Sequence, residues 1–155
     1  MKKILLILSY LRYTQSTVTQ AIRIAKEENA ELIALFVVDI EFANGIVHKL
    51  TDEGWIGGKP SQQFYGSLLK EYELQAKDKI AEIEKQAAEH NIRMQAIIKN
   101  GPLLREVLKL VELEEPDLIM ITRRRRSNLS RKILGSLPDA LSKQVDCEVK
   151  IIDAD

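Results

Sequence analysis

A run of arginines is the part of this sequence best suited to binding a charged ligand. Arg123, Arg124, Arg125 and Arg126 are consecutive, and Arg131 and Lys132 follow closely. No acidic residue occurs between Thr122 and Lys132. Guanidinium groups bind phosphate well, in a bidentate manner where the geometry allows it. The run therefore indicates an anion-binding loop.

The arginine run has two other interpretations. The first is a solvated basic loop that pairs with acids such as Glu112, Glu114 and Glu115, on its own chain or a partner chain. The second is nucleic-acid binding, which is disfavoured because no aromatic residues that could stack on bases lie near the arginines. The 23 basic and 23 acidic residues also give a net charge of zero, so the whole molecule is not attracted to nucleic acid or membranes.

Motifs typical of catalysis are absent from the sequence. The stretch from Glu53 to Pro60 resembles a phosphate-binding P-loop, but Glu53 replaces its first glycine and Pro60 its magnesium-binding hydroxyl. The single cysteine, Cys147, is expected to pack as a small buried apolar residue. His48 and His90 lack a matching ligand pattern and suit surface or helix-end positions. We predict no catalytic residue, no metal and no resident cofactor.

Short apolar runs and helical patterns alternate along the chain. Runs without polar interruption are typical of strands buried on both faces of a parallel sheet, and they predict strands at residues 4–8, 32–38, 92–99, 117–122 and 147–152. Helical spacing predicts helices from Thr14 or Ser16 to about Asn29, over 61–90, from 101 to before Pro116, and from Ser136 to 145. Residues 41–60 lack periodicity and predict a long loop with room for one short helix.

This alternation predicts an α/β fold: a Rossmann-like open parallel five-stranded sheet with helices on both faces, formed by one domain over residues 1–155. Ligands of such sheets bind beyond the carboxyl ends of the strands, where the winding reverses. Those ends include residues 8–9, 37–39 and 121–123. The first apolar run is too short to span a bilayer or to form a signal-peptide core, so we expect a cytoplasmic protein.

Several segments together resemble the universal stress protein family over nearly the whole chain. They are KKILLILS, AELIALFVVD, NGPLLREVLKLVELEEPDLIMI and RSNLSRKILGSLPDALSKQVDCEVKII. The resemblance implies an adenine nucleotide alpha hydrolase-like fold. It also implies a role in stress response.

ATP-binding members of that family carry an acidic residue after the first strand and a loop of pattern G-x2-G-x9-G-[ST] after the fourth. The resemblance implies an equivalent nucleotide site at Ser9, Val37, Thr122, Arg125, Gly135 and Ser136. Ser9 replaces the acid, and Thr122 and Arg125 replace two glycines. Because a β-carbon obstructs the approach of backbone N–H groups to phosphate, the glycine loop is degenerate. Gly135 and Ser136 are also explained by a helix N-terminus.

The resulting expectation is a non-enzymatic universal stress protein that acts through dimerisation and partner contacts. The last strand lacks a proline after Cys147, so Glu148 keeps its N–H and a homodimer can form along this edge. One alternative is a module that binds ATP or another phosphorylated ligand with Arg123 to Arg126. A slow ATP hydrolase is the other.

Overall fold

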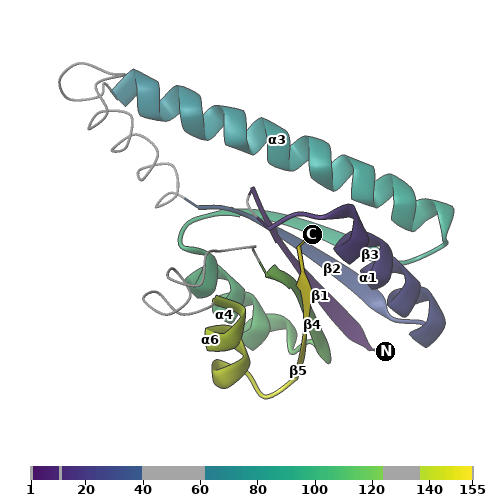
Figure 1. Ribbon diagram of the computed structural model, residues 1–155. Helices are drawn as coiled ribbons and strands as arrows, with labels where there is room; N and C mark the ends of the chain where they lie inside the picture. Colours follow the sequence, from purple (N-terminus) through teal and green to yellow (C-terminus); the bar gives the residue numbers. More distant parts are fainter. Residues whose placement is uncertain (1, 11, 40–61, 124–136, 155) are drawn as a thin grey trace.

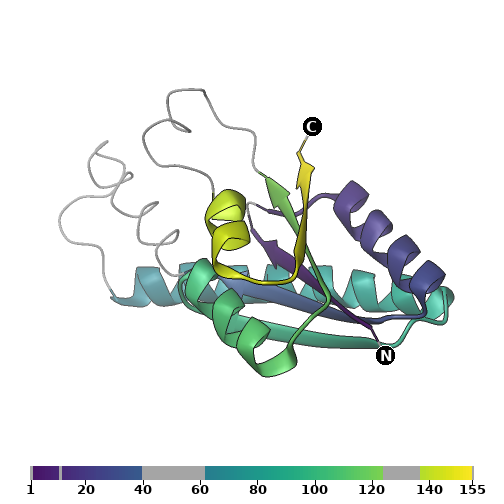
Figure 2. The same cartoon turned by 90° about the horizontal axis from the view of Figure 1, so that it is seen from below.

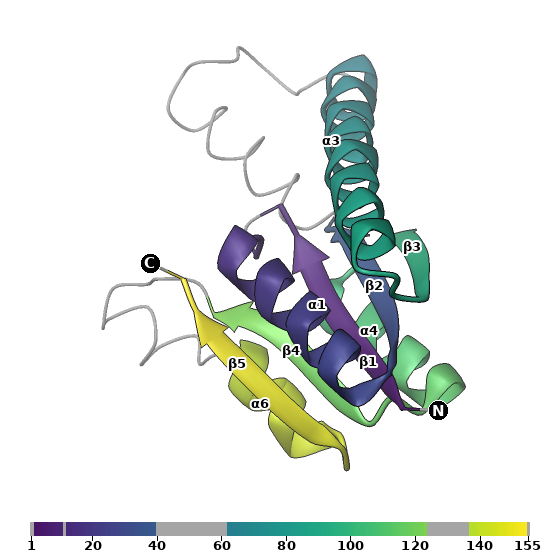
Figure 3. The same ribbon diagram turned by 90° about the vertical axis from the view of Figure 1, so that its right-hand side faces the viewer.

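Five parallel strands run through the centre of the protein. The computed structural model describes residues 2–10, 12–39, 62–123 and 137–154. The strands are β1 (Lys3–Ser9), β2 (Glu31–Val38), β3 (Met94–Asn100), β4 (Leu118–Arg123) and β5 (Glu148–Asp153). They lie in the order β3-β2-β1-β4-β5, as Figure 3 shows, and every neighbouring pair is parallel. The predicted Rossmann-like sheet is confirmed.

Helices cover both faces of this sheet. They are α1 (Gln15–Glu28), α3 (Gln62–Glu89), α4 (Leu103–Glu114) and α6 (Leu137–Gln144). α1 and α3 lie on one face and α4 and α6 on the other (Figures 1 and 2). None of the described helices combines the length and apolar character needed to cross a membrane.

The two faces of the sheet explain the uninterrupted apolar run in β1. Ile4, Leu6 and Leu8 belong to the core under α1 and α3, whereas Leu5 and Ile7 belong to the core under α4 and α6. Because successive side chains of a strand point to opposite faces, a strand covered on both sides needs apolar residues at every position.

The long helix α3 packs on the sheet through one apolar stripe. The stripe consists of Tyr72, Ala76, Ile80, Ile83 and Ala87, which are all buried and recur at steps of three or four residues. The buried face of α4 is similarly narrow and consists of Leu103, Val107 and Leu110. Together with α1, these helices hold the strands in place and fix where each strand ends.

The ends of the helices follow local hydrogen bonding. The side chain of Thr14, rather than Ser16, caps α1 by accepting from the Thr17 N–H, and Asn29 ends the helix in the left-handed conformation. β3 begins at Met94, later than predicted, because the Ile92 N–H donates to the Ala87 carbonyl at the end of α3. The predicted cap Ser136 and the predicted loop 41–60 lie outside the described residues.

Candidate functional site

The winding of the sheet reverses between β1 and β4. From β1 the chain moves outward through β2 to β3, and it then returns to β4 on the other side of β1. In open α/β sheets the carboxyl ends of two such strands diverge into opposite connections, and ligands bind between them. The ends of β1 and β4 are therefore the candidate site.

Two predicted site residues, Ser9 and Val37, lie next to each other at this edge. Ser9 is the last residue of β1 and pairs in register with Val37 of β2. Both side chains are buried. The Arg12 N–H donates to the Ser9 carbonyl over 3.0 Å, so the chain turns back sharply after β1. Because of this turn, Arg12 lies directly beside the end of the strand.

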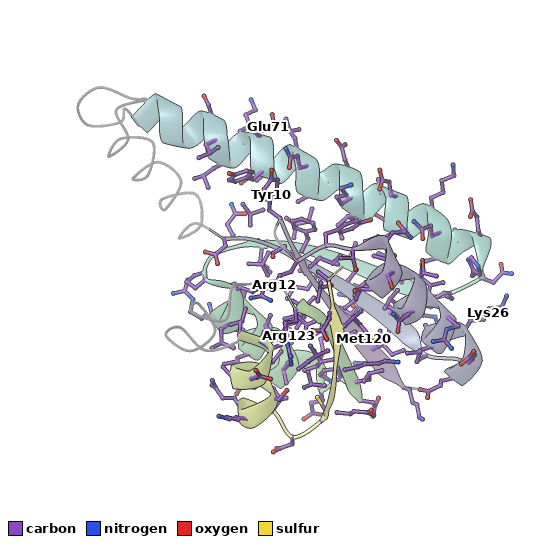
Figure 4. The ribbon with its side chains drawn as sticks, in the orientation of Figure 1. Tyr10, Arg12, Lys26, Glu71, Met120 and Arg123 are labelled. Carbon is purple, nitrogen blue, oxygen red and sulfur yellow. The ribbon has the colours of Figure 1, made fainter. Side chains whose placement is uncertain are left out.

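Arg12 is the main residue of the edge that the sequence did not reveal. Its side chain is only 5% exposed, and its Nη1 donates to the Thr122 carbonyl oxygen over 3.0 Å. Thr122 immediately precedes Arg123, the last residue of β4, and Figure 4 labels both arginines. Arg12 belongs to no motif or periodic pattern. Its position right after a buried strand is the one available signal.

Thr122 is held from a second direction by α1. Its hydroxyl lies 2.8 Å from the hydroxyl of Thr17, and both side chains are fully buried. The Thr17 hydroxyl also lies 2.8 Å from that of Thr14, the residue that caps α1. We call Ser9, Arg12, Thr17 and Thr122 the switch-point cluster. Its members join β1, the first turn of α1 and the end of β4.

Arg123, the first residue of the arginine run, forms ion pairs with two aspartates. Its Nη2 lies 3.3 Å from Oδ1 of Asp139 in α6, and its Nε lies 3.7 Å from Oδ1 of Asp153 in β5. These are not the acids suggested by the sequence, and Glu114 instead pairs with Lys3 over 3.1 Å. Arg123 therefore links β4 to its neighbours.

Other predicted site residues fall outside the described part of the chain. They are Arg124, Arg125, Arg126, Gly135 and Ser136. His48 is also outside it, whereas His90 lies at the end of α3 with its Nδ1 2.8 Å from the Gln86 carbonyl oxygen. That is a helix-end position, as predicted.

Hydroxyl and guanidinium groups dominate the chemistry of the described edge. Such groups donate hydrogen bonds to oxyanions and to carbonyl oxygens. In the described ranges, the hydroxyls of Thr17 and Thr122 are bonded to each other rather than to a histidine or a carboxylate. Nor do the described residues gather three His, Cys, Asp or Glu side chains into a potential metal site. The described edge therefore offers hydrogen-bond donors to the oxygen atoms of a ligand.

Cys147 lies away from the switch-point cluster, just before β5. It is half-buried and packs against the core under α4 and α6. Burial raises the pKa of its thiol, and the carboxylates of Asp117 and Asp146 add to the effect. A raised pKa lowers the thiolate fraction at neutral pH, which disfavours a nucleophilic role.

A separate pocket of about 380 Å³ lies at the opposite end of the sheet, where α1 and α3 end. Lys26, His90 and Arg93 contribute basic groups to its lining. Carbonyl groups at helix C-termini carry partial negative charge, which opposes the attraction of these bases for anions. The switch point remains the better candidate for an anionic ligand.

A doubly wound parallel sheet with a polar cluster at its switch point defines a Rossmann-like α/β protein with the architecture of small-molecule-binding domains. Residues 1–153 match the model of the universal stress protein family, and the chain belongs to this family. It is 29% identical to the universal stress protein MJ0531 of Methanocaldococcus jannaschii over 132 residues, which cover 85% of this chain and 70% of that protein.

Solved structures of the family share this fold. The universal stress protein UspA from Lactobacillus plantarum is 19% identical with a TM-score of 0.70, and the match covers 97% of each chain. A universal stress protein in complex with cAMP is 15% identical with a TM-score of 0.58, covering 99% of this chain and 98% of that one. An Arabidopsis thaliana family protein with AMP bound is 13% identical with a TM-score of 0.59, covering 100% and 93%.

Proposed function

We propose that this chain is a non-enzymatic universal stress protein of the cytoplasm, a single domain that acts in stress response as a homodimer and through partner contacts. Membership of the family supports the stress role. The non-enzymatic role is supported by the switch-point cluster, whose Thr17 and Thr122 hydroxyls are bonded to each other. The observation that carries the proposal most directly is the position of β5 at the edge of the sheet.

The edge strand β5 has the chemistry of a pairing surface. Within the described residues it pairs with β4 alone, and its apolar side chains Val149, Ile151 and Ile152 are only half-buried. An open strand edge offers unpaired N–H and C=O groups to another chain. Antiparallel pairing with a two-fold axis at Val149 would set Glu148 of one copy opposite Lys150 of the other, twice per dimer.

Charge reversal on β5 tests this pairing. Lys150→Glu would place like charges opposite each other at both pairs, where each favourable pair contributes about 0.2–1 kcal/mol, so the dimer should dissociate more readily. The double variant Glu148→Lys/Lys150→Glu restores opposite charges and should restore the dimer. Analytical ultracentrifugation measures the dimer dissociation constants of both variants. A wild-type monomer at high micromolar concentration would refute the homodimer.

A second candidate function is the binding of a phosphorylated small molecule at the carboxyl edge of the sheet. The run Arg123 to Arg126 supplies positive charge there, and Arg12 adds a buried guanidinium. The relatives solved with cAMP and with AMP support a ligand of this chemical class. Ser9, Val37, Thr122, Arg125, Gly135 and Ser136 are the proposed contact positions, and Arg123 to Arg126 the proposed anion ligands.

Thermal unfolding in phosphate tests the second candidate. A ligand that binds only the native state stabilises it by about 1.4 kcal/mol at ten times its Kd. Phosphate should therefore raise the Tm of the wild type, and Arg124→Gln/Arg125→Gln should lose most of the gain. The variant also controls for general salt effects. Equal stabilisation of both proteins would argue for a solvated basic loop. Mass spectrometry of small molecules released from the purified protein would identify a bound ligand.

A further inference from the structure

Arg12 joins the two strand ends between which a ligand of this fold would lie. Its main chain is hydrogen-bonded to Ser9 at the end of β1, with the N–H of Arg12 donating over 3.0 Å. Its side chain is hydrogen-bonded to Thr122 of β4, with Nη1 donating to the carbonyl oxygen over 3.0 Å. Ser9 and Thr122 are both proposed ligand positions. One side chain therefore bridges the switch point from within the protein.

We propose that Arg12 closes the switch point, so that a nucleotide enters only when the Arg12 side chain leaves Thr122. The proposal rests on the second candidate function given above. Two requirements lead to it. A ligand between β1 and β4 needs the space that the 5%-exposed Arg12 side chain fills. Hydroxyl groups of a bound sugar would also compete with Nη1 for the Thr122 carbonyl oxygen.

The surrounding contacts confine the required movement to the Arg12 side chain. The hydrogen bonds between Ser9 and Arg12 fix the main chain at this turn. The hydroxyl pair of Thr17 and Thr122 fixes the end of β4 against α1. With both partners held, release of the Thr122 carbonyl requires rotation about the side-chain bonds of Arg12. The strands themselves need not separate.

The residue at position 9 removes a competing partner for the guanidinium. A carboxylate at the end of β1 would form an ion pair with a neighbouring arginine, and its full negative charge attracts a guanidinium more strongly than the partial charge of a carbonyl oxygen does. Ser9 is neutral, and it is hydrogen-bonded to Arg12 through the main chain. The chain therefore lacks at this position the charge that would draw Arg12 toward β1 and away from Thr122.

Calorimetric titration with AMP tests the closure. Arg12→Ala removes both the bulk and the donor, and we expect AMP to bind at least about tenfold more tightly than to the wild type, the range expected for a charged hydrogen bond that no longer has to be broken. Arg12→Met is the matched control, because it keeps a long side chain in place. Because methionine also lacks the donor to Thr122, the affinity of this variant should rise, but clearly less than that of Arg12→Ala.

Two results would overturn the proposal. Unchanged binding of AMP by Arg12→Ala would mean that Arg12 has no effect on binding, and weaker binding would mean that Arg12 contacts the ligand. A gain for Arg12→Met as large as that for Arg12→Ala would mean that the side chain does not fill the site. Circular dichroism verifies the fold of each variant, and Arg12→Ser, with a polar side chain, replaces Arg12→Ala if the latter does not fold.

Phosphate stabilisation distinguishes failure of this proposal from failure of the second candidate function, on which it rests. If phosphate stabilises the wild type through Arg124 and Arg125 while Arg12→Ala gains no affinity for AMP, the closure alone is wrong. If phosphate stabilises neither the wild type nor Arg12→Ala, and AMP binds to neither, the ligand function and the closure fail together.

Discussion

The hydroxyl of Thr17 lies 2.8 Å from the hydroxyl of Thr122, and both side chains are fully buried. This contact joins the first turn of α1 to β4 across 105 residues of sequence. Thr17→Val leaves the buried Thr122 hydroxyl without this partner, and we expect a loss of about 1–3 kcal/mol in the free energy of unfolding. Urea denaturation measures the loss.

The double variant Thr17→Val/Thr122→Val provides the control for this contact. The double variant contains neither hydroxyl, so no hydroxyl of this pair is left buried without its partner. It should therefore lose less stability than the sum of the two single losses. Strict additivity of the two losses would show that the hydroxyls do not interact.

The cap of α1 depends on Thr14. Its side chain accepts from the Thr17 N–H, while the side chain of Ser16 is exposed and bonds only to Gln20 among the described residues. Thr14→Ala should therefore destabilise the protein by about 0.5–2 kcal/mol. Ser16→Ala should change stability by about 0.5 kcal/mol or less. Thermal unfolding of the two variants measures these effects. Equal losses of stability would show that Thr14 is not the cap.

The ion pairs of Arg123 should contribute unequally to stability. Asp139 lies in the first turn of α6, where a carboxylate also interacts favourably with the helix dipole, and its contact with Arg123 is the shorter of the two. Asp139→Asn should cost about 0.3–1 kcal/mol, and less at high salt. Asp153→Asn, whose carboxylate is largely exposed, should have a smaller effect. Denaturation at low and high salt measures both, and the reverse order would contradict the geometry.

The thiol of Cys147 should make the protein less stable in alkali. Burial raises its pKa above the ordinary 9.0, so the unfolded chain loses this proton at lower pH than the folded protein does. The folded state then binds more protons near pH 9, and its stability must fall as the pH rises through this range. Burial also raises the pKa of Tyr13 and of Tyr72, whose ordinary values are 10.0, so their contribution follows at higher pH.

Cys147→Ala isolates the contribution of the thiol. Between about pH 8 and pH 9.5 its unfolding free energy should decline less steeply than that of the wild type. Parallel curves for the two proteins would show that the thiol titrates alike in the folded and unfolded states.

The sequence predicted the elements of the fold better than the contacts at their ends. The apolar run from Ile4 to Leu8 predicts a strand that is covered on both faces, and the structure has this strand. The helical spacing of apolar residues likewise predicts α3. The alternation of strands and helices along the chain does not predict the order of the strands in the sheet, because β1 pairs with β4 through contacts between segments that are distant in sequence. Arg12 was missed for the same reason. A charged residue in a short connection is normally exposed, and only the meeting of β1 and β4 buries it.

The central place of β1 has a consequence for synthesis of the chain. One edge of β1 pairs with β2, which follows soon after it, but the other edge pairs with β4, more than a hundred residues later. Until residues 118–123 leave the ribosome, the apolar strand from Ile4 to Leu8 has an unpaired edge, and such edges recruit other chains into aggregates. Nascent chains that have not yet reached β4 should therefore be the species that most needs chaperones, and truncation before Leu118 should yield insoluble protein.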